Sequence, residues 1–190
     1  MPSEDRREEY RGAVLVARLW KGKYQGKAWS AGSEVATVRG ESIEAVLSNL
    51  KSAVDAEWRI EEMGSPIAYP SQEEYEKALL NIIDNVPETY LLMLKAHFRA
   101  PDRILTARQL ARAASYKDWQ SANLHYGTLA RRVGEAMLFQ PRPRKSGEPI
   151  WTLVLAKGDD SDPDSEEFRW EMRDELAQAL KITGIVQNVA

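Results

Sequence analysis

Near the start of the chain, an apolar run rich in β-forming residues over 13–20, an alternating stretch over 24–30 and a short run over 33–39 predict three strands. A lysine-glycine-lysine turn separates the first two, because glycine tolerates the backbone conformations of tight turns. After Ser42, a residue type that caps helices, apolar side chains recur at helical spacing through Val54. The pattern therefore predicts a β-β-β-α module.

Capping signals mark the starts of further helices. Ser71 is followed by Glu74 at the third helical position, which is the capping-box arrangement, and Pro87 lies near the first residue of the next helix. That helix is expected to end before Pro101. Residues 56–70 contain glycine and proline breakers and predict a connector.

A pair of helices joined by a polar turn is predicted next. Thr106 and Gln109 form a second capping box, residues 115–119 form the turn, and either Asp118 or Ser121 caps the following helix. The apolar residues of that helix expected to face the core are Ala122, Leu124, Leu129 and Val133. This order is typical of a helix-turn-helix of the winged type, whose second helix enters a DNA groove.

A basic hairpin is expected after the second helix. Arg142, Arg144 and Lys145 precede a Ser-Gly pair that predicts the hairpin tip, and residues 150–155 are expected to form its return strand. A basic tip suits a wing that grips phosphates. The hairpin is therefore the predicted wing.

The end of the chain begins with an acidic, turn-rich stretch over residues 158–165. It lacks the ligand spacing of a calcium loop, so we expect a solvated loop. A strand over residues 166–172 and a helix over residues 173–181 are predicted after it.

Charge is distributed unevenly along the chain. Ten basic and three acidic residues lie between Arg99 and Lys145, a net charge of +7 in a protein whose overall charge is −3. Lysine and arginine displace the counterions condensed on nucleic-acid phosphates, so a basic segment in an acidic protein suits DNA binding. The alternative is a solvated arginine face that serves solubility.

Composition excludes several classes of protein. The 190 residues include no cysteine, which excludes disulfides, thiol nucleophiles, cysteine-based zinc sites and iron–sulfur clusters. The charged N-terminus does not resemble a signal peptide, and no apolar run is long enough for a membrane span. We therefore expect a cytoplasmic protein with no membrane contact.

The predicted site residues fall into two groups: residues that contact bases in the DNA groove and residues that contact phosphates. Asparagine and glutamine can pair with adenine, and arginine with guanine or phosphate. The expected groove residues are Gln120, Asn123, His125 and Thr128, and the expected phosphate contacts are Arg131, Arg132, Arg142, Arg144 and Lys145. Apart from His125, the sequence contains only one histidine, His97, so we expect no metal site. The sequence also lacks a nucleophile motif, a phosphate-binding loop and a metalloprotease motif. We therefore expect no catalytic residue and no cofactor.

Two resemblances bear on these expectations. The segments GKYQGKAW and VRGESIEAVLSNLKSAV, residues 22–29 and 38–54, resemble the HicB-like, partial double-stranded-RNA-binding-domain fold over about a quarter of the chain. The usual acidic, proline-rich stretch before the third strand is missing. The resemblance implies a module that binds a protein partner or dimerises.

Residues 90–180 resemble the domain that precedes HNH nuclease domains in McrA-like restriction proteins, most specifically in ANLHYGTLA, residues 122–130. That resemblance implies DNA recognition. The zinc-binding cysteines and the histidine cluster of an HNH nuclease are missing, so cleavage by that mechanism is not expected.

The sequence predicts an α+β protein: a small β-sheet-plus-helix module over residues 1–60, a linker over 61–70, and a winged-helix-like module over 71–190. The leading hypothesis is a non-enzymatic protein that binds double-stranded DNA in restriction, phage defence or transcriptional regulation. The alternative is a protein-binding regulator, such as an antitoxin or an inhibitor of a nucleic-acid enzyme. A protein partner of the N-terminal module and a homodimer are both left open.

Overall fold

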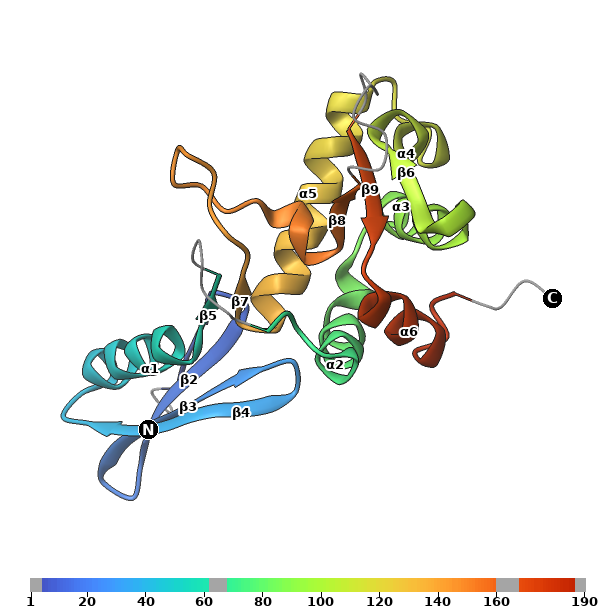
Figure 1. Ribbon diagram of the computed structural model, residues 1–190. Coiled ribbons are helices and arrows are strands. Elements are labelled where there is room, and N and C mark those ends of the chain that lie inside the picture. Colours follow the sequence, from blue (N-terminus) through green and yellow to red (C-terminus); the bar gives the residue numbers. More distant parts are fainter. Residues whose placement is uncertain (1–4, 62–67, 160–167, 187–190) are drawn as a thin grey trace.

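The computed structural model describes residues 5–61, 68–159 and 168–186. The protein is α+β, with 49% of the described residues in helices and 27% in strands. A four-stranded antiparallel sheet with one helix forms the N-terminal half, and a mainly helical part with a small sheet forms the remainder (Figure 1).

The N-terminal sheet is a meander in which each strand pairs with the next, in the order β1-β2-β3-β4. Its elements are β1 (Arg6–Tyr10), β2 (Ala13–Trp20), β3 (Lys23–Ser30), β4 (Ser33–Gly40) and the helix α1 (Ile43–Glu57). The three predicted strands and the helix capped by Ser42 are confirmed. The sequence pattern missed β1, because its mostly charged residues do not alternate with apolar ones, as is common for edge strands.

Helix α1 covers one face of this sheet. Val46, Leu50 and Val54 of the helix and Leu15 of β2 are fully buried in a common apolar cluster. Gly26 of β3 allows the close approach, since a Cβ atom there would lie 2.5 Å from the Val46 side chain. No helix of the described residues packs extensively on the opposite face of the sheet (Figure 1).

The C-terminal half has a larger apolar cluster of its own. Its elements are α2 (Gln72–Ile82), η1 (Ile83–Asn85), α3 (Glu88–Arg99), η2 (Pro101–Arg103), β6 (Ile104–Thr106), α4 (Ala107–Ala113), α5 (Trp119–Ala136), β8 (Ala156–Asp159), β9 (Arg169–Met172) and α6 (Asp174–Ile182). The strands form an antiparallel sheet in the order β6-β9-β8. Apart from the two-residue strand β7 and the 3₁₀ helices, the chain therefore runs helix, strand, helix, helix, strand, strand from α3 to β9.

The predicted helix starts are confirmed by their caps. Ser71 with Glu74 and Thr106 with Gln109 each form a complete capping box, and Asp118 caps α5 by accepting from the Ser121 backbone at 2.7 Å. The prediction that Leu124 faces the core was wrong, because 68% of this residue is exposed. It lies on the outer face of α5, opposite the buried residues Tyr126 and Val133.

The basic hairpin forms, but its return strand does not. Pro143 bridges Pro149, and the Ile150 N–H donates to the Arg142 carbonyl at 3.1 Å. The expected strand over residues 150–155 was wrong: Trp151–Val154 form the 3₁₀ helix η3. This compact turn buries Val154 against Gly134 of α5, which an extended strand could not do.

The two halves meet at the C-terminal end of α5. The short strand β5 (Arg59–Ile60) pairs in parallel with β7 (Phe139–Gln140), and the Ser30 hydroxyl donates to the Ala136 carbonyl at 2.7 Å. Residues 59–61, read in the sequence as connector, thus take part in this junction. Of the other segments expected to be irregular, residues 62–67 and most of the acidic stretch 158–165 lie outside the described residues.

Candidate nucleic-acid interface

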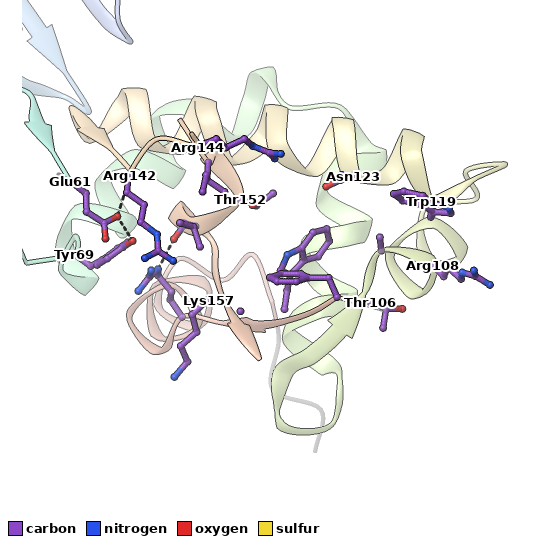
Figure 2. Close-up of a pocket in the computed structure, with 17 residues that line it drawn as sticks. Glu61, Tyr69, Thr106, Arg108, Trp119, Asn123, Arg142, Arg144, Thr152 and Lys157 are labelled. Atoms are coloured by element: carbon purple, nitrogen blue, oxygen red, sulfur yellow. Dashed lines mark hydrogen bonds between the residues drawn. The ribbon is translucent and has the colours of Figure 1, made fainter. Parts of the chain in front are cut away.

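A groove of about 920 Å³ lies beside the first turns of α5 (Figure 2). Its walls come from segments far apart in the sequence: the residues preceding α2, the start of α4, α5, the basic hairpin, η3, β8 and β9. Five cationic residues and one carboxylate line it, namely Arg108, Arg142, Arg144, Lys157, Arg173 and Glu61. Among the described residues, the lining is therefore strongly basic.

The cations differ in how far they are already engaged. Lys157 pairs with Glu171 at 3.0 Å. The Arg173 Nε donates to the Leu153 carbonyl at 2.7 Å, and its guanidinium lies 3.3 Å from the centre of the Tyr69 ring. The side chains of Arg142 and Arg144 make no ion pair within the described part of the chain, so they remain available to an anionic ligand.

Aromatic rings add an apolar component to the groove. Trp119, at the first position of α5, is 44% exposed, and Phe168 is 60% exposed. Phe168 contacts Trp170 edge-on, with ring centres 5.9 Å apart. Trp119 and Arg108 lie at one end of the groove and Arg142 and Tyr69 at the other (Figure 2). Exposed rings beside cations are the combination that binds nucleic-acid bases and phosphates.

Glu61 fixes the base of the hairpin. Its Oε2 atom accepts from the Arg142 backbone N–H at 3.0 Å and from the Tyr69 hydroxyl at 2.5 Å. Burial of the phenol, reinforced by this hydrogen bond, raises the pKa of Tyr69 to about 12. The hydroxyl therefore remains a proton donor over the physiological pH range.

The hairpin tip is closed by its own backbone. The Arg144 N–H donates to the Glu148 carbonyl at 2.7 Å, and the Gly147 N–H donates to the Arg144 carbonyl at 2.9 Å. Gly147 has a φ of +89°, which favours glycine at this turn. Residues 142–148 are all exposed, so the side chain of Lys145 projects into solvent at the tip.

The structure brings together only part of the predicted site. Asn123, Arg142 and Arg144 line the groove, whereas Gln120 is exposed on α5 outside its lining. The Thr128 hydroxyl donates to the Leu124 carbonyl of its own helix at 2.9 Å. Neither Gln120 nor Thr128 is therefore positioned by a neighbouring element.

Arg131 and Arg132 point in different directions. The Arg131 Nε donates to Glu135 at 2.7 Å, and its guanidinium lies 6.0 Å from the centre of the Trp151 ring, on the side of η3. The Arg132 guanidinium donates to the Asn85 carbonyl at 2.9 Å, on the side of η1. Neither arginine is part of the groove lining to which Arg142 and Arg144 belong.

His125 packs against two tyrosines of its own module. Its Nδ1 atom lies 2.9 Å from the Tyr90 hydroxyl, and its ring stacks on Tyr116 with centres 4.8 Å apart. These contacts join α5 to α3 and to the turn after α4. The histidine predicted to face the DNA groove is thus held between aromatic side chains of its own module.

The other histidine, His97, is fully buried in the larger core. Its Nε2 lies 2.9 Å from the Trp170 carbonyl, which can only accept, so Nε2 carries the proton and Nδ1 accepts from the Tyr126 hydroxyl at 2.6 Å. Burial lowers the pKa of His97 to about 4. A neutral imidazole therefore links α3, α5 and β9.

Sequence reasoning missed most of the groove. It did not select Glu61, Tyr69, Arg108, Trp119, Lys157, Phe168, Trp170 or Arg173. Trp119 carried no signal of exposure, because it lies three residues before Ala122 and seven before Tyr126, in line with the buried stripe of α5. The remaining residues converge only through the tertiary fold.

Comparison with known proteins assigns no family to the chain. Neither a family model, nor a curated protein, nor a solved structure matches the chain. No group of acidic, histidine or cysteine residues suited to a metal ion occurs among the described residues. Across those same residues, no helix combines the length and apolar character that crossing a membrane requires.

Proposed function

We propose that this protein is a non-enzymatic DNA-binding protein whose C-terminal module contacts DNA through the groove beside α5 and the basic hairpin. The observation that carries the proposal is the groove lining, in which five cations and one carboxylate meet beside exposed aromatic rings. Phosphates are the polyanionic partner that this charge favours, and counterion release drives the binding.

The order of elements supports the same function. When the two-residue strand β7 and the 3₁₀ helices are set aside, the order from α3 to β9 is helix, strand, helix, helix, strand and strand, with β6 pairing β9, as in a winged helix-turn-helix. In that arrangement α5 is the helix that enters the major groove. The segment between β8 and β9 is acidic in sequence, with five carboxylates over residues 160–167, so the hairpin at 141–150 is the better phosphate-binding element.

The proposed contacts follow from position and charge. Arg142, Arg144 and Lys145 would hold phosphates, because they are exposed and unpaired within the described chain. Asn123 would meet a base edge, where its amide can pair with adenine in bidentate fashion. The N-terminus of α5 is a poor phosphate site, because Asp118 already caps it and hydrogen bonds from the Ser121 backbone and hydroxyl lower the pKa of that carboxyl.

The biological setting is proposed as restriction, phage defence or transcriptional regulation. The alternative, a regulator that binds a protein through acidic residues of the N-terminal module, has less support. Several of those carboxylates already have basic partners on the α1 side, namely Glu8 with Lys51, Glu44 with Arg6 and Asp55 with Arg11.

Fluorescence anisotropy with labelled duplexes at increasing salt tests the proposal. We expect tight binding at low salt and a linear fall of log affinity with log salt. Arg144→Glu should reduce that slope by about one, as expected for a lost phosphate contact. The matched control for Arg144→Glu is Lys77→Glu, which reverses an equal charge at an exposed position of α2 outside the groove. If no duplex binds at low salt, with base-modified duplexes included, the proposal is wrong.

A further inference from the structure

The face of the N-terminal sheet opposite α1 is basic at one end. The register places Arg18, Gln25 and Arg39 in one cross-strand row and Trp20 with Lys23 in the next. Their positions alternate with Leu15, Ala17 and other residues buried under α1, so these side chains project from the uncovered face. α1 is the one helix of the described chain that packs extensively on this sheet.

Trp20 lies at the centre of this basic end. The residue is 51% exposed, and the Arg18 guanidinium lies 5.0 Å from the centre of its ring. Lys21, in the turn that follows, lies 6.0 Å from the same ring. Arg18, Lys21, Lys23 and Arg39 make no ion pair within the described part of the chain. We name these four cations and Trp20 the Trp20 cluster.

Many of the other charged residues of the module are paired with one another. At the other end of the same face, Glu34 is neutralised by Lys27 at 2.5 Å, and this contact lowers the pKa of Glu34. On the helix side, acidic and basic residues pair with one another. Four cations without an ion pair in the described chain are thus gathered around an exposed aromatic ring, and Arg7 of β1 is a further such cation on the same face.

We propose that the Trp20 cluster binds single-stranded nucleic acid, with a base stacked on the Trp20–Arg18 pair and phosphates held by Lys21, Lys23 and Arg39. Stacking on aromatic and guanidinium planes beside a basic groove is how proteins bind unpaired strands. A second copy of the chain is a poor occupant of this face, because two such clusters would repel. The site is separate from the groove beside α5 and does not depend on the function proposed for it.

The test uses the full chain and labelled single-stranded oligonucleotides, oligo-dT and oligo-U, in anisotropy titrations at low and moderate salt. Trp20→Ala should weaken binding about tenfold, which corresponds to the loss of one stacked base. Trp20→Phe, which keeps a ring, should restore most of the affinity. Arg39→Glu should reduce the salt slope, whereas Lys77→Glu should not.

The outcomes are distinguishable from those of the duplex experiment. Trp20→Ala should leave duplex binding unchanged, and Arg144→Glu should weaken duplex binding much more than single-strand binding. Preference for oligo-U over oligo-dT would identify RNA as the partner, and the reverse would identify DNA. Circular dichroism and thermal melting establish that each variant is folded. Absence of single-strand binding at low salt, or wild-type affinity in both Trp20→Ala and Arg39→Glu, would overturn the proposal.

Discussion

The carboxylate of Glu61 accepts a hydrogen bond from the backbone N–H of Arg142 and thereby ties the segment before α2 to the base of the basic hairpin. The same oxygen accepts from the Tyr69 hydroxyl, whose ring lies under the Arg173 guanidinium. The one carboxylate of the groove lining therefore acts as an anchor, and the position of the hairpin depends on residues read in the sequence as linker.

Removal of the Glu61 carboxylate should lower both the stability of the protein and its affinity for duplex DNA. Glu61→Ala leaves the Arg142 N–H and the Tyr69 hydroxyl without their acceptor, so we expect a loss of about 1 kcal/mol in the free energy of unfolding. Affinity for duplex DNA should fall a few-fold, because the hairpin is no longer held. Tyr69→Phe removes only one of the two hydrogen bonds and should cost less. Urea denaturation and anisotropy measure both quantities, and wild-type values for Glu61→Ala would contradict this role.

The buried His97 makes stability depend on pH. Its pKa is about 4 in the folded protein against 6.5 for an exposed histidine, so between these values the unfolded chain binds a proton that the folded chain does not. Stability is therefore complete above about pH 6.5 and falls as the pH decreases towards 4. Between pH 7 and pH 5 we expect a loss of about 2 kcal/mol in the free energy of unfolding from this residue alone.

His97→Gln provides the comparison, because glutamine can donate to the Trp170 carbonyl but does not titrate. The variant should be less stable at pH 7 and should show a much shallower decline between pH 7 and pH 5. Urea denaturation at several pH values measures the two slopes. Parallel slopes would show that another group causes the decline.

Asn123 and His125, adjacent in the predicted recognition set, should behave differently. Asn123→Ala should leave stability within about 0.5 kcal/mol and weaken binding to the preferred duplex by about 1–3 kcal/mol. His125→Phe keeps the stack on Tyr116 but removes the hydrogen-bond partner of the Tyr90 hydroxyl, at a cost of about 1 kcal/mol in stability. Its DNA affinity should be unchanged. The assignment of His125 fails if this variant unfolds as the wild type does and loses DNA binding.

Local signals in the sequence predicted much of the fold. Ser42, Ser71, Thr106 and Asp118 cap helices where the sequence placed them, because a cap is determined by residues within one turn of it. The strands β2, β3 and β4 followed from short runs of β-forming residues, of which the one over 24–30 alternates. The α+β class follows from these elements together.

Features that depend on distant residues were not predictable in this way. β5 pairs with β7 across about 80 residues of sequence, and neither strand has a pattern of its own. The run at 150–155 reads as a strand by composition, yet packing against Gly134 coils it into η3. The groove beside α5 is likewise assembled from segments between Glu61 and Arg173, so only Asn123, Arg142 and Arg144 were selected.

Alanine substitutions at two glycines can distinguish the cost of backbone strain from the cost of disturbing the contact between the two parts of the chain. Gly12 and Gly22 follow hairpin residues of positive φ and themselves have φ values of +75° and +73°. A Cβ atom at Gly22 would meet nothing within 4 Å, whereas one at Gly12 would lie 2.4 Å from the Glu135 backbone of α5. Gly22→Ala should therefore cost about 1 kcal/mol, the price of a left-handed conformation in a non-glycine residue.

Gly12→Ala carries the same backbone strain and must also displace α5 from the N-terminal sheet. We expect an additional loss of about 1–3 kcal/mol, as for overpacking of a rigid contact. The Ser30 hydrogen bond to Ala136 and the pairing of β5 with β7 should loosen with it, which hydrogen exchange at residues 59–60 and 139–140 can detect. If Gly12→Ala and Gly22→Ala lowered the free energy of unfolding equally, the N-terminal sheet and α5 would not be in tight contact at Gly12.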